Sequence, residues 1–322
     1  MILLPTILIG ALVVCFGLCR DSAAEPPRYT IGVVLPLSGS SAEFGQTARA
    51  AIELALEQLP PEDRGRMKVI FEDDGLVSSR SVSAGRKLID IDRVDALITW
   101  SSSTALSLVG ITESRKIPHV AIASDPAVSR GRRYTFTYWA LPEDEAELVY
   151  GYLMKRSKKR IGVLAVTHNG ILANRTALEA IIARRGGLTV VASEEVSDSV
   201  LDFRSVIERI KGRGAIDAFV PMFFPGQLSA AVRQARGLGI EAEIAGFETF
   251  EDKAEIAAAN GALSGAVFAT GADPTPAFLR DFQIRFPRLS LYTASNSYDS
   301  LVLLAQATRS EKRPEAVAAF LR

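Results

Sequence analysis

Residues 94–123 read VDALITWSSSTALSLVGITESRKIPHVAIA. The two ends of this segment, 94–99 and 119–123, are short apolar runs of the kind that form strands buried on both faces. Between them, 103–115 has the length and apolar spacing of a helix. Apolar strands separated by amphipathic helices indicate a parallel sheet that is covered by helices on both faces.

The same alternation extends from this segment in both directions and forms two series. Two series of strands indicate two such sheets, so we predict an α/β protein. The first series has strands at 29–35, 67–71, 94–99, 119–123 and 134–138, and helices at 42–59, 78–90 and 103–115. The second has strands at 160–166, 188–192, 216–222 and near Ile244 and Val267, and helices at 143–157, 172–185, 202–211 and 226–238.

Two lobes follow from the two series, because a chain of about 300 residues usually divides into two cores. No Gly/Ser-rich linker separates the series. We expect one lobe to consist of 29–141 together with 271–322, and the other to consist of 142–270. Short extended crossings near 140–142 and 270–274 would join them.

The composition is that of an ordinary globular protein. The chain has 322 residues, 48% of them hydrophobic, and its 37 basic residues balance its 37 acidic residues. This balance argues against a general nucleic-acid binder, which would carry a basic surplus. Chains with this composition are not disordered or fibrous.

The first 24 residues have the pattern of a secretory signal peptide. Residues 2–19 carry no charge, and the small residues Ser22, Ala23 and Ala24 follow shortly after. We expect cleavage after Ala24 and an extracytoplasmic, periplasmic protein. The alternative is an uncleaved membrane anchor, since about 18 apolar residues can just span a bilayer.

Both cysteines of the chain, Cys15 and Cys19, lie inside this leader. A mature chain would therefore have no thiol, which excludes disulfides, thiolate metal sites and cysteine nucleophiles.

The loops that follow the strands are the places to search for a ligand site, since ligands of open α/β sheets bind there. The loop 36–47 has glycines at phosphate-loop spacing, but Gln46 stands where such a loop needs lysine. The run of serines at 101–103 opens a helix and offers N–H groups, hydroxyls and the positive end of the helix dipole to a carboxylate. Simple capping of the helix by one serine is the alternative.

Enzymatic chemistry has no support in the sequence, so we expect a protein that is not an enzyme and has no cofactor or metal. The chain contains neither GxSxG nor HExxH. Its two histidines, His119 and His168, lack metal-ligand spacing. Serine–histidine catalysis would need one of them beside a serine in a cleft, and nothing in the sequence places either there.

Nine segments resemble, in order, the motifs of the type I periplasmic binding proteins of branched-chain amino acid transporters, the Leu/Ile/Val-binding family. The resemblance implies two Rossmann-like lobes with parallel sheets, joined by a hinge, that close around an amino acid or a related amide or small carboxylate. The segments are IGVVLPLSGSSAEFGQ, FEDDG, WSSST, IPHVAIASDP, RYTFTYWALPEDEA, DFRSVIERIKGRGAIDAFV, FFPGQLSAAVRQARGLG, AGFETF and SNSYDSL.

The resemblance also implies partners and binding residues. The ligand would be delivered to the membrane permease of an ABC transporter by a monomer; a sensor of the same fold that regulates another protein, or a hydrolase, is the alternative. Ser101 and Ser102 would bind the ligand carboxylate, and Ala123 and Glu248 would bind its ammonium group. The aromatic walls would be Phe44, Phe224 and Tyr298.

Asp125 stands where this family commonly has a threonine that helps to hold the ammonium group. Two acids, Asp125 and Glu248, would then face one small site. They would favour a ligand with more positive charge, or one of them would need a raised pKa.

Overall fold

The computed structural model describes residues 29–309 and 311–322. The predicted signal peptide at 1–24 and both cysteines therefore lie outside the described residues. Among the residues described, no helix combines the length and the apolar character needed to span a bilayer.

The first sheet has five parallel strands in the order β2-β1-β3-β4-β5. Every strand lies within two or three residues of its predicted position. Its strands are β1 (Tyr29–Leu35), β2 (Met67–Asp73), β3 (Ala96–Trp100), β4 (His119–Ile122) and β5 (Thr135–Thr137). The helices that accompany it are α1 (Ala42–Gln58), α2 (Pro61–Arg64), α3 (Ser78–Arg86) and α4 (Ser102–Arg115).

The second sheet is also five-stranded and parallel, in the order β10-β9-β8-β6-β7. Its strands are β6 (Arg160–Val166), β7 (Thr189–Val196), β8 (Ala218–Met222), β9 (Glu243–Gly246) and β10 (Val267–Phe268). Its helices are α5 (Pro142–Lys155), α6 (Asn169–Arg185), α7 (Arg204–Gly212), α8 (Leu228–Gly237) and α9 (Lys253–Ala258).

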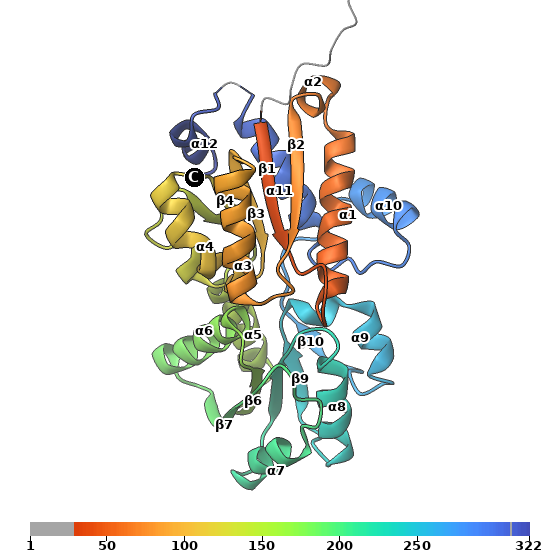
Figure 1. Cartoon of the computed structure of the whole chain (residues 1–322). Coiled ribbons are helices and arrows are strands. Elements are labelled where there is room, and N and C mark those ends of the chain that lie inside the picture. The colour runs from red at the N-terminus through yellow and green to blue at the C-terminus, as the bar shows by residue number, and fades with distance from the viewer. Residues whose placement is uncertain (1–28, 310) are drawn as a thin grey trace, which may run out of the picture.

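The two sheets form two stacked parts of the molecule, and the chain passes between them twice (Figure 1). It leaves the first sheet after β5 and returns after β10 to α10 (Pro276–Arg285), α11 (Ala294–Ala307) and α12 (Pro314–Phe320). Leu301 and Leu304 of α11 pack in the same core as β1 and β3. The predicted α/β fold with two parallel sheets is confirmed, whereas the lobe boundaries at 141/142 and 270/271 stay a prediction.

Burial on both faces explains why the strands are apolar throughout. In β1, Ile31, Val33 and Leu35 pack against α1 and α11 on one face. On the other face, Val34 packs with Leu88, Leu97 and Leu108. The alternate side chains of the strand therefore all enter a core, and none needs to be polar.

Two elements differ from the prediction for local reasons. The helix expected at 78–90 is α-helical only to Arg86 and continues as a π-helical turn, Lys87–Ile91. The strand expected at 188–192 extends to Val196 as β7. Because β7 is an edge strand, its outer residues such as Glu194 are polar, and an apolar run does not mark its end.

Gly45 lets α1 pass close to the loop that follows β1. A Cβ atom at this position would lie 2.1 Å from the carbonyl oxygen of Pro36. Alanine normally stabilises a helix interior by about 1 kcal/mol relative to glycine. Here we expect Gly45→Ala to lower the free energy of unfolding by about 1–3 kcal/mol, because the backbone must shift. Urea denaturation measures this change.

Gly110 of α4 is the matched control, since nothing lies within 4 Å of a Cβ atom placed there. Gly110→Ala should be neutral or stabilising. Equal effects of the two substitutions would contradict the proposed close approach at Gly45.

Candidate functional site

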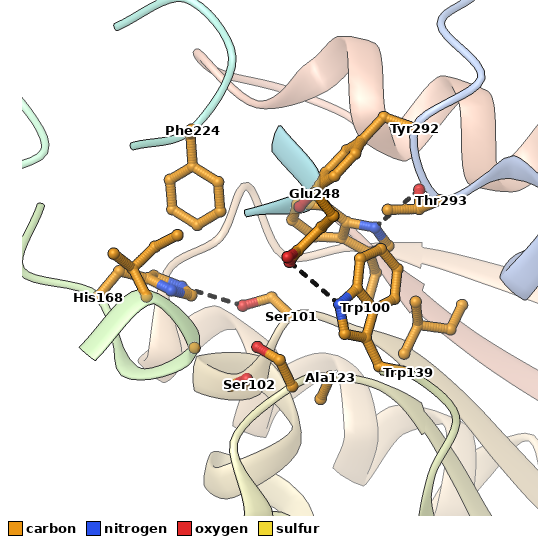
Figure 2. A pocket seen from close by; sticks show the side chains of 14 residues that line it. Trp100, Ser101, Ser102, Ala123, Trp139, His168, Phe224, Glu248, Tyr292 and Thr293 are labelled. Carbon is orange, nitrogen blue, oxygen red and sulfur yellow. Dashed lines mark hydrogen bonds between the residues drawn. The ribbon is translucent and has the colours of Figure 1, made fainter. Parts of the chain in front are cut away.

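A pocket lies between the two parts of the molecule, where strands of both sheets end. Its cavity volume is about 40 Å³. Residues that follow β3 and β4 line one side, and residues that follow β6, β8 and β9 line the other (Figure 2). The lining consists of Trp100, Ser101, Ser102, Ile122, Ala123, Ser124, Trp139, His168, Gly170, Ile171, Phe224, Glu248, Tyr292 and Thr293.

The start of α4 forms one end of this pocket. Ser101 is its N-cap residue, with a left-handed φ of 86°, and its Oγ accepts a hydrogen bond from the N–H of Ser103 at 3.2 Å. The Oγ of Ser102 accepts a hydrogen bond from the N–H of Asp125 at 3.1 Å. Ser101 therefore caps the helix, which was the alternative to a binding role for the serines. Ser101 and Ser102 nevertheless also line the pocket.

His168 follows β6 of the second sheet, and its ring contacts the N-terminus of α4. Its Nε2 lies 3.3 Å from the Oγ of Ser101 and 3.0 Å from the Oγ of Ser103. Burial lowers the pKa of His168 to about 4, so the ring is neutral at pH 7. Neither histidine was expected beside a serine of the cleft, and this expectation is wrong for His168.

This serine–histidine contact is not a complete catalytic arrangement. The Nδ1 of His168 is buried and has no hydrogen-bond partner among the described residues. A catalytic histidine needs a group at that nitrogen to orient it, usually a carboxylate. Nor do the described residues contain a group of three or more acidic, histidine or cysteine side chains that could hold a metal ion.

Glu248 also lines the pocket, just after the chain leaves β9. It is only 6% exposed. Its Oε1 accepts a hydrogen bond from the Nε1 of Trp139 at 3.1 Å (Figure 2). The Trp139 ring meets Tyr292 edge-on at 5.6 Å, which fixes the indole against the pocket wall. The pocket is thus lined by both a helix N-terminus and a buried acid.

Five of the eight residues predicted to bind ligand line this pocket, and three do not. The five are Ser101, Ser102, Ala123, Phe224 and Glu248.

Phe44 lies one layer behind the wall, where its ring stacks on Trp100 at 5.6 Å and meets the edge of Tyr292 at 5.7 Å. Asp125 caps the turn that follows β4, accepting from the N–H of Ala127 at 2.8 Å, and lines a separate cavity. Hence the two acids Asp125 and Glu248 do not face each other across one small pocket.

Tyr298 lies on α11 beside a neighbouring hollow of about 880 Å³. Its hydroxyl donates to the Oε1 of Gln58 at 2.7 Å, and its ring meets Phe278 edge-on. The side chain of Tyr298 therefore faces α1 and α10 and does not line the pocket.

The sequence analysis did not name the other pocket residues as binding residues. Trp100 is the last residue of β3, and His168 lies two residues after β6. Their positions at the ends of strands could therefore have marked them as candidate pocket residues. Tyr292 and Thr293 lie far from Trp100 in the sequence. The Nε1 of Trp100 nevertheless donates a hydrogen bond to the Oγ1 of Thr293 at 3.1 Å. No local pattern marks such a tertiary contact.

Comparison with known proteins gives one consistent result. The family described as periplasmic binding protein matches residues 28–322. The chain is 26% identical to Leu/Ile/Val-binding protein homolog 3 of Brucella melitensis over 264 residues, which is 79% of this chain and 70% of that protein. It is 24% identical to Leu/Ile/Val-binding protein homolog 8 of Brucella suis, over 66% of this chain and 56% of that protein.

Solved structures share the fold. A leucine binding protein, LivK, from Thermotoga maritima has a TM-score of 0.81 at 20% identity, covering 91% of this chain and 87% of that one. LivJ of Streptococcus pneumoniae, in complex with isoleucine, has a TM-score of 0.78 at 21% identity with the same coverage. A solute binding protein from Rhodopseudomonas palustris, in complex with 3,4-dihydroxy benzoic acid, has a TM-score of 0.78 at 18% identity, covering 90% and 83%.

Given a family match over residues 28–322 and two parallel sheets that meet at a pocket, the chain belongs to the periplasmic binding protein family.

Proposed function

We propose that this protein is the extracytoplasmic solute-binding component of an ABC transporter. It captures an amino acid or a related small molecule between its two lobes and delivers it to a membrane permease. The observation that carries the proposal is that the N-terminus of α4 and the buried carboxyl group of Glu248 line the same pocket. A molecule with a carboxylate and an ammonium group matches these two groups.

The carboxylate end rests on Ser101 and Ser102. The first N–H groups of a helix have no acceptor within the helix, and the helix dipole adds positive potential there. A carboxylate placed at this terminus receives hydrogen bonds from these N–H groups and from the serine hydroxyls.

The ammonium end rests on Glu248 and Ala123. The Oε2 atom of Glu248 is buried and receives no hydrogen bond from any described residue. Each oxygen of a carboxylate accepts more than one hydrogen bond, so an ammonium group can donate to Glu248 with charge assistance whether or not another donor is present. The carbonyl of Ala123 can accept a further hydrogen bond from the ammonium group. The rings of Trp139 and Phe224 then surround the apolar part of the ligand.

The size of the cavity implies that the lobes open to admit the ligand. A volume of about 40 Å³ is far below the roughly 300–1,000 Å³ of typical ligand pockets. The hydrogen bonds between His168 and the hydroxyls of Ser101 and Ser103 also join the segment after β6 to the start of α4. We therefore assign the two crossings, near 140–142 and 270–274, as the hinge of a clamshell motion.

A thermal-shift screen of amino acids, amides, small carboxylates and polyamines tests the proposal. A ligand that binds only the folded protein stabilises it by about 2.7 kcal/mol at 100 times its Kd. For a chain of this size the Tm should rise by about 4 °C. Related proteins are named for leucine, isoleucine and valine, so these are the first candidates. A folded protein whose Tm responds to none of these compounds would contradict the proposal.

A further inference from the structure

A second buried acid, Glu145, neighbours Glu248. It belongs to the first turn of α5 and is only 1% exposed. Its Oε2 accepts a hydrogen bond from the Nδ2 of Asn174 at 3.2 Å. Its carboxyl group is within hydrogen-bonding reach of the carboxyl group of Glu248.

Each carboxyl group has one buried oxygen with no donor. These atoms are Oε1 of Glu145 and Oε2 of Glu248. Two carboxylate oxygens repel each other, and burial strengthens that repulsion. A single proton between them removes one charge and supplies the missing hydrogen bond to both.

Neither carboxyl group forms an ion pair with a cation among residues 29–309 and 311–322, and the neighbours that act most strongly on Glu145 are acidic or neutral. Glu251 adds negative charge from the turn after β9, and Asn174 from α6 is neutral. Asp252 and Tyr292 lie in the same electrostatic neighbourhood. Burial first, and then the charge of Glu248, raises the pKa of Glu145 to about 11. Burial and Glu248 also raise the pKa of Glu251, to about 7.

We propose that Glu145 is a positioning residue that stays protonated at neutral pH and donates its proton to the Oε2 of Glu248. The Nε1 of Trp139 already holds the other oxygen of Glu248. The ammonium end of the pocket therefore carries one negative charge rather than two. That charge matches a ligand with a single ammonium group, such as a zwitterionic amino acid, and not a dication. This step deepens the proposed function and rests on it.

The proton itself can be tested without any ligand, by urea denaturation of the wild type and Glu145→Gln between pH 6 and pH 8. The folded-state pKa is raised, so folding keeps a proton that the unfolded chain loses above about pH 4.5. This stabilisation is complete below that pH and is lost as the pH rises toward the folded-state pKa. The unfolding equilibrium constant of the wild type should rise about tenfold per pH unit relative to Glu145→Gln.

Glu143→Gln is the matched control, because Glu143 lies on the same helix and is exposed. It should keep the pH dependence of the wild type. Glu251 titrates in all three proteins, so only the difference between slopes is informative. Equal slopes for the wild type and Glu145→Gln would overturn the proposal.

The positioning role is tested with L-leucine as the probe, by calorimetry at pH 7. Glutamine has the shape and charge of a protonated glutamic acid and can donate from its amide. Glu145→Gln should therefore keep the affinity for L-leucine within about twofold, whereas Glu145→Leu, which cannot donate, should weaken it about tenfold or more. A tenfold loss in Glu145→Gln would show that Glu145 contributes a charge, and would overturn the proposal.

Failure of the proposed function gives a different result. If L-leucine and the other amino acids bind none of these proteins while the slopes differ as expected, the amino-acid function is wrong and the proton on Glu145 stands.

Discussion

Replacing Asp74 with alanine should lower the free energy of unfolding by about 3–5 kcal/mol. Asp74 is fully buried at the end of β2. Its Oδ2 accepts from the hydroxyls of Ser81 at 2.7 Å and Thr104 at 2.6 Å, and its Oδ1 accepts from the N–H of Leu76 at 2.9 Å. Hydrogen bonds to a charged group contribute about 1.5–3 kcal/mol each. The variant also leaves the buried hydroxyl of Thr104 without an acceptor, whereas the hydroxyl of Ser81 keeps the carbonyl oxygen of Val77 at 3.2 Å.

Asp74 also has a functional position, because Thr104 lies in the first turn of α4. The carboxylate thus connects the loop after β2 to α4, the helix whose N-terminus lines the pocket. Urea denaturation measures the loss. Asp90→Ala is the control, since Asp90 pairs with Arg115 on the surface and such pairs contribute about 0–1 kcal/mol. A loss below 1 kcal/mol for Asp74→Ala would contradict the role given to this network.

Glu248→Gln should weaken the binding of an amino acid about 10- to 150-fold. The neutral amide removes the charge from the hydrogen bond to the ammonium group, and such a bond contributes about 1.5–3 kcal/mol. The side-chain oxygen of glutamine can still accept from Trp139, so the fold should be retained. Calorimetry with L-leucine measures the change, and the Tm of the ligand-free variant checks its folding.

Two controls separate this effect from a general loss. Glu241→Gln removes an exposed acid just before β9 and should leave affinity unchanged. The ligand 4-methylpentanoate has the carboxylate of leucine but lacks its ammonium group, so its binding should not fall with Glu248→Gln. Unchanged affinity for L-leucine in Glu248→Gln would remove Glu248 from the site.

The architecture could be predicted from the sequence because both faces of each sheet are covered. A strand such as β6 has no solvent face, so its residues form an apolar run that is visible without alignment. Edge strands and irregular turns lack this signal. The polar end of β7 and the π-helical turn at 87–91 depend on neighbours in the sheet and on local packing.

The site could be predicted where a residue directly follows a strand. Ser101 follows β3 and Glu248 follows β9, and both line the pocket. Side-chain direction is the part that sequence does not give. Asp125 also follows a strand, yet it turns to cap the N–H of Ala127. Glu145 is one acid among several in the first turn of α5, and only its burial against Glu248 distinguishes it.

Trp100 and Trp139 are the two tryptophans of the chain, and both indoles line the pocket. Trp100 donates to Thr293 and Trp139 to Glu248, so each is attached to a residue from a distant part of the chain. The tryptophan emission of the protein therefore originates at this pocket. A change in its intensity or wavelength reports directly on this cavity, with no dye or label attached.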